Sequence, residues 1–257
     1  MFRSSEWSHR TRYAGVHVLL SMGVASLIAS LMFFVWYPEP YRSLSGGLQL
    51  FLILVLVDVT LGPCATLVVS HPRKPVREWR TDMALIVLLQ LAALGFGMWT
   101  VYQARPVYLA FEIDRFRIIH AVDVPASLLS MAPPDFKSLP IMGPKRVAVR
   151  PFRGEQERID ATVAALSGVF LGARPDLWMP YEDAAQMVLE EAKPIEGLLS
   201  QEPDYRSLIL NAIEAEKLPQ AEVLYLPLAG RQDFWTVLLS ARSGEPFAYL
   251  PIDPYGP

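Results

Sequence analysis

Three long apolar runs within the first 102 residues constrain this chain more than any other feature. They extend over Tyr13–Tyr37, Leu48–Val69 and Met83–Tyr102, and Asp58 is the one formally charged residue inside them. About 20 consecutive apolar residues suffice to cross the hydrocarbon core of a bilayer. We therefore predict three transmembrane helices. The first run is too long for a signal peptide and lacks a small-x-small cleavage site, so we expect an uncleaved anchor.

The composition changes after Tyr102. Residues 1–102 carry 8 Lys+Arg and 5 Asp+Glu, whereas residues 103–257 carry 15 and 21, a balance of −6. The second part is long enough to bury a core of its own. We therefore expect a transmembrane domain over residues 1–102 and a water-exposed domain over residues 103–257. The acidic balance of the second part argues against nucleic acid as a partner.

The basic residues between the apolar runs predict how the chain is oriented. Three arginines precede the first run, and the loop 38–47 carries one, Arg42. The loop 70–82 carries four basic residues: Arg73, Lys74, Arg77 and Arg80. Loops rich in Lys and Arg stay in the cytoplasm. We therefore expect a cytoplasmic N-terminus and a C-terminal domain across the membrane, in the periplasm if the cell is Gram-negative.

The pattern after residue 103 predicts an α+β domain. Residues 107–113 alternate as a half-buried strand does, and a proline-rich connector follows over 125–151. Helical periodicity then predicts three helices, at Gly154–Leu171, Pro180–Lys193 and Asp204–Leu218. The apolar stripe of the first consists of Ile159, Val163, Leu166, Val169 and Phe170. Three strands, Glu222–Leu228, Asp233–Ala241 and Glu245–Ile252, should close the chain as an antiparallel β-meander.

Asp58 is the position in the apolar runs that needs a physical explanation. It lies about 16 Å from either end of its run, at about 1.5 Å per residue. A carboxylate at that depth is costly unless it faces protein or water. Pro63 frees a backbone carbonyl near Val59, and Gln90 lies at a similar depth in the third run. Two interpretations remain open: a functional relay or partner-binding carboxylate, and a polar clasp with Gln90 that fixes helix packing.

The sequence lacks the motifs of the common enzyme classes. It has no Gly-rich phosphate loop, His-Glu-x-x-His, Gly-x-Ser-x-Gly or Cys/His metal spacing. An intramembrane aspartyl protease needs two neighbouring carboxylates, and Asp82 lies about 17 Å from Asp58 in depth. We therefore predict no catalytic residue, cofactor or metal. Asp114 and Arg115, which follow the first predicted strand, are interpreted as a structural ion pair.

With these residues in view, the chain resembles the type IV pilin accessory proteins of the TfpX/TfpZ type, over most of its length. The segments that carry the resemblance include the run Val57–Pro63, the pattern from Asp82 through Gln90 to Gly97, Arg105-Pro106 with Asp114-Arg115, and the C-terminal Leu226-Pro227-Leu228 and Gly244-Glu245-Pro246. The resemblance implies a bacterial inner-membrane protein that is encoded with a major pilin. It further implies that the chain assists pilin stability or assembly, alongside other pilus assembly proteins, without enzyme activity.

The first hypothesis for function is therefore a membrane-bound accessory factor or chaperone for a specific type IV pilin. The alternative is a membrane-anchored sensor or receptor with an external ligand-binding domain. The short tail and short loop on the cytoplasmic side offer such a sensor no output domain.

Overall fold

The computed structural model describes residues 2–71, 74–201, 205–231 and 233–255. Two compact units make up the chain, residues 1–104 and residues 105–257, and each is described by itself. Their boundary lies two residues beyond the one expected from composition. Arg73, which contributed to the loop charge, and Asp204, where the third C-terminal helix was expected to begin, lie outside the described residues.

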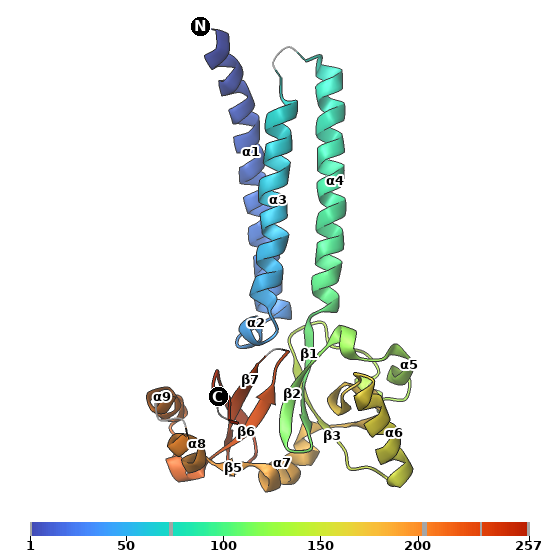
Figure 1. Cartoon of the computed structure of the whole chain (residues 1–257), viewed down its shortest axis with the longest axis vertical. Coiled ribbons are helices and arrows are strands. Elements are labelled where there is room, and N and C mark those ends of the chain that lie inside the picture. The colour runs from blue at the N-terminus through green and yellow to red at the C-terminus, as the bar shows by residue number, and fades with distance from the viewer. Residues whose placement is uncertain (1, 72–73, 202–204, 232, 256–257) are drawn as a thin grey trace. The chain divides into compact units, whose positions relative to one another are not determined.

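The N-terminal unit consists of three long helices (Figure 1). These are α1 (Phe2–Leu31), which continues into the π-helical turn η1 (Met32–Trp36), α3 (Gly47–Val69) and α4 (Val76–Gln103). A short α2 (Tyr41–Leu44) connects η1 to α3. All three helices are long and apolar enough, by length and composition, to cross a membrane, and they contain the three predicted spans. α4 begins seven residues before the apolar run, so two polar helical turns precede that run within the same helix.

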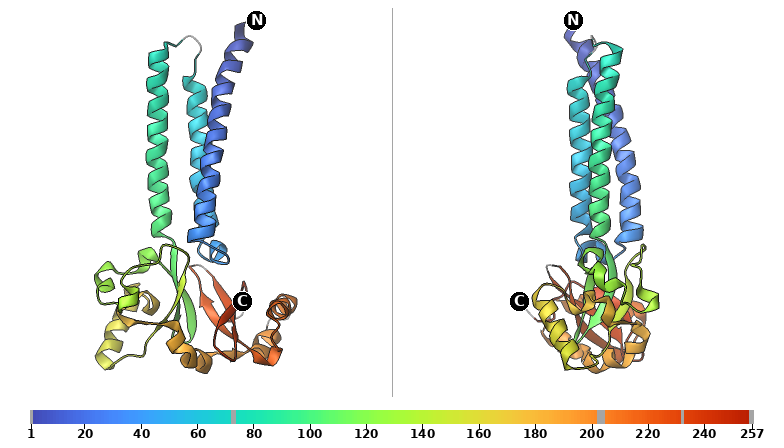
Figure 2. Two further views of the ribbon diagram at one scale, coloured as in Figure 1. Left: turned by 180° about the vertical axis from the view of Figure 1, so that it is seen from behind. Right: turned by 90° about the vertical axis from the view of Figure 1, so that its right-hand side faces the viewer.

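Helix α3 lies at the centre of this unit and packs against both α1 and α4 (Figure 2). A buried cluster forms where η1 meets the ends of α3 and α4. Within it the Tyr37 hydroxyl donates a hydrogen bond to the Val101 carbonyl over 3.1 Å. A Cβ at Gly47 would lie 2.6 Å from Cδ1 of Tyr37, so only glycine permits this packing.

The C-terminal unit is built on one eight-stranded mixed sheet. The strands are β1 (Pro106–Glu112), β2 (Arg115–His120), β3 (Lys145–Val149), β4 (Trp178–Met179), β5 (Lys193–Pro194), β6 (Val223–Ala229), β7 (Phe234–Ser240) and β8 (Pro246–Leu250). Their order is β4-β3-β1-β2-β6-β7-β8, with β5 paired to β6. The β1–β3 and β2–β6 pairs are parallel, and the others are antiparallel. The α+β class and the C-terminal β6-β7-β8 meander are therefore as predicted.

Four of the eight strands were not expected: β2, β3 and the two-residue strands β4 and β5. β2 pairs with β1 as a hairpin, so the chain reverses where the sequence analysis placed the far end of one strand. The reversal occurs at Ile113, whose φ of 57° is rare for a β-branched residue. β3 lies inside the proline-rich segment that was predicted to be an extended connector on the surface, and it pairs with β1. An extended chain between prolines can still add to a sheet edge.

Helices cover the sheet in two groups. α5 (Ala126–Leu129) and α6 (Glu155–Leu166) lie in the half that contains β1–β4, and α7 (Ala185–Glu191), α8 (Ile195–Gln201) and α9 (Arg206–Glu216) follow in the chain (Figure 1). Each half has its own apolar cluster. Trp178, Tyr108 and Val107 belong to the first, and Leu198, Ile209 and Tyr225 to the second. α8 was not predicted.

The apolar stripe of α6 faces away from the core, contrary to the expectation from its periodicity. Ala161 is fully buried against Val149 and Leu177, while Leu166 is 85% exposed. Ile159 and Val163 are exposed as well. The helix is turned this way because its small residue fits the close approach to the sheet. The same orientation directs Glu157 toward Arg150, so that one side of α6 is held by an ion pair.

Candidate functional site: the Asp58–Gln90 pair

Asp58 on α3 and Gln90 on α4 meet near the middle of the two helices. The Gln90 Nε2 donates to Oδ1 of Asp58 over 3.1 Å and to the Asp58 main-chain carbonyl over 3.3 Å. Pro63 was expected to free the main-chain carbonyl of Val59. Gln90 binds instead the main-chain carbonyl of the preceding residue, Asp58. In hydrocarbon, where water is absent, such a bond between helices satisfies groups that would otherwise be costly to bury.

Glycine at position 62 makes this contact sterically feasible. A Cβ at Gly62 would lie 2.0 Å from Nε2 of Gln90, closer than any real contact. Gly62 follows Asp58 by four residues, so the two share one face of α3. A second close approach between α3 and α4 lies nearer the C-terminal end of α4, where a Cβ on Gly97 would meet Cδ1 of Leu54 at 2.3 Å. The i, i+4 spacing places Gly62 on the same face as Asp58, but the sequence does not reveal that Gln90 packs against it.

Asp58 and Gln90 border two grooves. One, of about 430 Å³, runs between α3 and α4, and the other, of about 330 Å³, lies among α1, α3 and α4. The first is lined by Leu50, Ile53, Leu54, Val57, Leu61, Gly62, Ala65, Ile86, Leu89, Ala93, Leu94, Phe96, Gly97, Thr100 and Val101 besides the polar pair. Its walls are therefore almost wholly apolar, with one carboxyl and one amide near the middle.

A second polar contact links α1 to α3. His17 Nδ1 lies 2.6 Å from the hydroxyl of Thr66, which is buried. The contact between His17 and Thr66 was not expected from the sequence. In the described part of the chain, no group of three or more His, Cys, Asp or Glu side chains is arranged to hold a metal ion. Among the described residues, α3 thus makes a side-chain polar contact with each of its two neighbouring helices.

The other residues singled out from the sequence lie in the C-terminal unit and have structural partners there. Arg105 is buried, and its Nε and Nη2 donate to the Pro140 carbonyl over 3.4 and 3.2 Å. Pro106 begins β1. Asp114 and Arg115 form a bidentate ion pair at 2.7 and 3.1 Å, and the hydrogen bond from Arg115 lowers the pKa of Asp114. These contacts anchor the connector and the β1–β2 turn.

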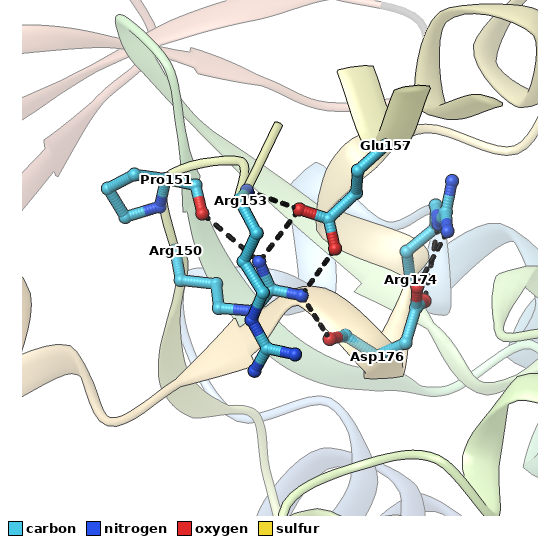
Figure 3. A network of polar contacts seen from close by, with 6 residues as sticks. All are labelled: Arg150, Pro151, Arg153, Glu157, Arg174 and Asp176. Atoms are coloured by element: carbon cyan, nitrogen blue, oxygen red, sulfur yellow. Dashed lines mark hydrogen bonds and ion pairs between the residues drawn. The ribbon is translucent and has the colours of Figure 1, made fainter. Parts of the chain in front are cut away.

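The sequence analysis missed a polar network on the inner side of α6 (Figure 3). Arg150 donates from Nη1 and Nη2 to the two oxygens of Glu157, over 3.0 and 2.7 Å, and from Nη2 to the Asp176 carbonyl over 3.2 Å. The hydrogen bonds from Arg150 and from the Arg153 main-chain N–H lower the pKa of Glu157 to about 2. Glu157 is therefore a carboxylate at neutral pH, and it serves to hold α6 rather than to donate protons.

The arrangement around Asp58 suits helix association better than bond-breaking chemistry. Asp82, the nearest other carboxyl considered for catalysis, forms an ion pair with Lys74 instead. What the site offers is a long apolar surface with one polar pair, Asp58 and Gln90, at mid-depth. Such surfaces bind membrane-spanning helices through close packing and interhelical hydrogen bonds.

Comparison with known proteins places the chain in a family. The family description "Fimbrial assembly protein FimB" matches residues 5–46. Two relatives from Dichelobacter nodosus, the fimbrial assembly proteins of serogroups I and E1, are each 34% identical over 230 residues, covering 89% of this chain and 90% of theirs. A third, of serogroups C1 and C2, is 43% identical over 113 residues, 44% of this chain and 86% of its own length. No solved structure matches the chain. The similarity extends through the membrane helices into the sheet domain, and the chain belongs to the fimbrial assembly protein family.

Proposed function

We propose that this protein is an inner-membrane accessory factor that assists one type IV pilin in stability and pilus assembly. The observation that carries the proposal is the similarity to fimbrial assembly proteins over 89% of the chain, membrane helices and sheet domain together. None of these relatives is named as an enzyme. The apolar walls around Asp58 and the pairing of Asp82 with Lys74 favour binding over catalysis.

In this proposal the two units have different tasks. The sheet domain, in the periplasm, chooses the pilin, because specificity needs distinguishing polar and shaped groups that apolar membrane helices largely lack. The membrane helices hold that domain beside a subunit waiting in the same bilayer. Tethering raises the effective concentration of a weak contact, so the domain needs only modest intrinsic affinity.

Removing the gene tests the function, and exchanging halves tests the division of tasks. Without the chain, the cognate pilin should fall in amount or fail to polymerise, measured by immunoblot and by counting surface fimbriae. Chimeras of two related proteins joined at Arg105 should take their pilin preference from the C-terminal part. Preference that follows residues 1–104 would move recognition into the membrane, and an unchanged pilus in the deletion strain would refute the function.

Orientation needs its own experiment. A reporter active only outside the cytoplasm should be active when fused after residue 257 and silent within the segment 73–78. The four basic residues of the loop 70–82 motivate this expectation. The reverse pattern would place the sheet domain in the cytoplasm.

A further inference from the structure

The groove between α3 and α4 has the length of a membrane-spanning occupant. Its lining residues recur every three or four positions from Leu50 to Ala65 on α3 and from Ile86 to Val101 on α4. Fifteen steps along a helix correspond to about 22 Å, against a hydrocarbon core of about 30 Å. An occupant that follows the groove would therefore cross most of the bilayer alongside the two helices.

The floor of the groove permits close approach. Ala65 and Ala93 are small, and small residues let helix backbones pack tightly in lipid. Longer apolar side chains form the rim, among them Leu61 and Leu89, which are 64% and 65% exposed. The floor and rim of the groove would together cover one side of an apolar helix.

Asp58 distinguishes a polypeptide occupant from lipid. Its Oδ1 accepts from Gln90, and within the described residues no hydrogen bond reaches Oδ2. A carboxyl group in hydrocarbon is costly until its oxygens are satisfied. An acyl chain has no donor to offer, whereas a helix with one Ser, Thr, Asn, Gln or Lys at the right depth does.

A second copy of this chain is a poor source of that donor. Ser26, Ser30 and Thr60 are exposed hydroxyl residues near mid-span, and each already donates to the carbonyl four residues earlier, over 2.9, 2.9 and 2.5 Å. Gln90 is engaged by Asp58, and His17 by Thr66. These five polar side chains thus already have hydrogen-bond partners within the chain.

We propose that the groove between α3 and α4 binds one apolar membrane-spanning helix of a partner, which donates a hydrogen bond to Asp58. This inference rests on the proposed function in one respect: the partner is the pilin. The Asp58–Gln90 pair then has two tasks. Gln90 holds α3 and α4 together through Oδ1, and Oδ2 anchors the bound helix at a fixed depth.

Photocrosslinking in living membranes tests the site with a matched control. A photoreactive amino acid replaces Leu89, in the groove, or Leu88, which is outside it and equally exposed at 66%. The full chain is expressed in cells that make the pilin. We expect at least tenfold more pilin adduct from position 89 than from position 88. Equal adducts, or adducts from position 89 with a second copy or with lipid alone, would overturn the proposal.

Filling the groove is an independent test that leaves the polar pair intact. Ala93 lines the groove and Ala92 does not, although both are exposed. Ala93→Phe should reduce the position-89 adduct at least tenfold, while Ala92→Phe should leave it unchanged. Adducts are compared at equal amounts of chain in the membrane. An undiminished adduct in Ala93→Phe would overturn the proposal.

Three further variants separate the anchor from the clasp. Asp58→Leu should reduce the adduct about 3-fold to 30-fold, the range for one interhelical hydrogen bond in a membrane. Asp58→Asn keeps an acceptor oxygen and should retain more adduct than Asp58→Leu. Gln90→Leu breaks the same α3–α4 contact but keeps the carboxyl, so the adduct should persist. If Gln90→Leu reduces the adduct as much as Asp58→Leu does, Asp58 serves helix packing alone and does not anchor the bound helix.

Pilus loss in the deletion strain without any position-89 adduct would leave the proposed function intact and refute only the proposal that the groove binds the pilin helix.

Discussion

Replacing Gly62 with alanine probes the closest contact in the helix bundle. The added Cβ would lie 2.0, 2.5 and 2.8 Å from Nε2, Cδ and Oε1 of Gln90. Gln90 must then swing away from Asp58 or α4 must shift. Gly95, on the next helix, is the matched control, because a Cβ there would meet nothing within 4 Å.

The magnitude follows from what each substitution changes. Glycine to alanine in a helix interior gains about 0.8–1 kcal/mol of helix propensity, and both variants share this gain. Gly62→Ala additionally loses the two Gln90 hydrogen bonds to Asp58, which membrane double-mutant cycles value at about 0.6 kcal/mol each. We therefore expect Gly62→Ala to be about 1–2 kcal/mol less stable than Gly95→Ala, and more if α4 is displaced.

The assay is reversible unfolding of the detergent-solubilised full chain in SDS, followed by energy transfer between dyes on α3 and α4. A double-mutant cycle isolates the contact, because Gln90→Ala removes the atoms that the new methyl would strike. In that background Gly62→Ala should behave like Gly95→Ala within about 0.5 kcal/mol. A coupling energy of zero between positions 62 and 90 would refute the steric explanation for Gly62.

Three further predictions concern the sheet domain, each measured by chemical denaturation of the full chain. The pKa of Glu157 falls from 4.5 to about 2 on folding, so its pair with Arg150 stabilises fully above about pH 4.5 and is lost as the pH falls through 2. Glu157→Gln should therefore cost about 1 kcal/mol at pH 7 and clearly less at pH 2, and an equal cost at both would exclude the ion pair as the cause. Leu166→Ser should change the free energy of unfolding by less than about 0.5 kcal/mol, whereas Ala161→Leu should cost about 1–3 kcal/mol; the opposite order would mean that α6 faces the other way. Tyr181→Phe should cost about 1 kcal/mol by removing the hydrogen bond to the Gly244 carbonyl, and a neutral result would contradict that bond.

The parts of the fold that were predictable are those with strong, repeated physical signals. Unbroken apolar runs define the spans, because any polar interruption in lipid is costly. The C-terminal meander was predictable from alternation and from the turn at Gly244, whose φ is +72°. The β1–β2 hairpin was not, since its turn places Ile113 at positive φ, where Asn or Gly is the usual signal.

The candidate site likewise has features that could be predicted from the sequence and features that could not. The depth of Asp58 and Gln90 can be counted along two helices, so their proximity could be anticipated from the sequence. The need for glycine at position 62 could not, because it depends on the rotation of α4 about its axis. For α6, periodicity identified a helix and its apolar stripe. It assigned the wrong face to the core because Ala161, not the large residues, occupies the closest contact with the sheet.

The pairing of β2 with β6 has a consequence for how this domain is made. Among the described residues, the strand pairing between the half containing β1–β4 and the half containing β6–β8 consists of two residue pairs, Phe116–Leu228 and Arg117–Ala229, and the ion pairs Arg146–Glu245 and Asp123–Arg231 add side-chain links. So short a strand pairing allows the halves to open and close as separate cooperative units, each around its own apolar cluster. During synthesis, residues 106–179 leave the ribosome well before β6 does, so the first half can fold with one sheet edge unpaired. That edge, a row of free N–H and C=O groups on β2, is the part of the nascent domain most exposed to mispairing until β6 arrives.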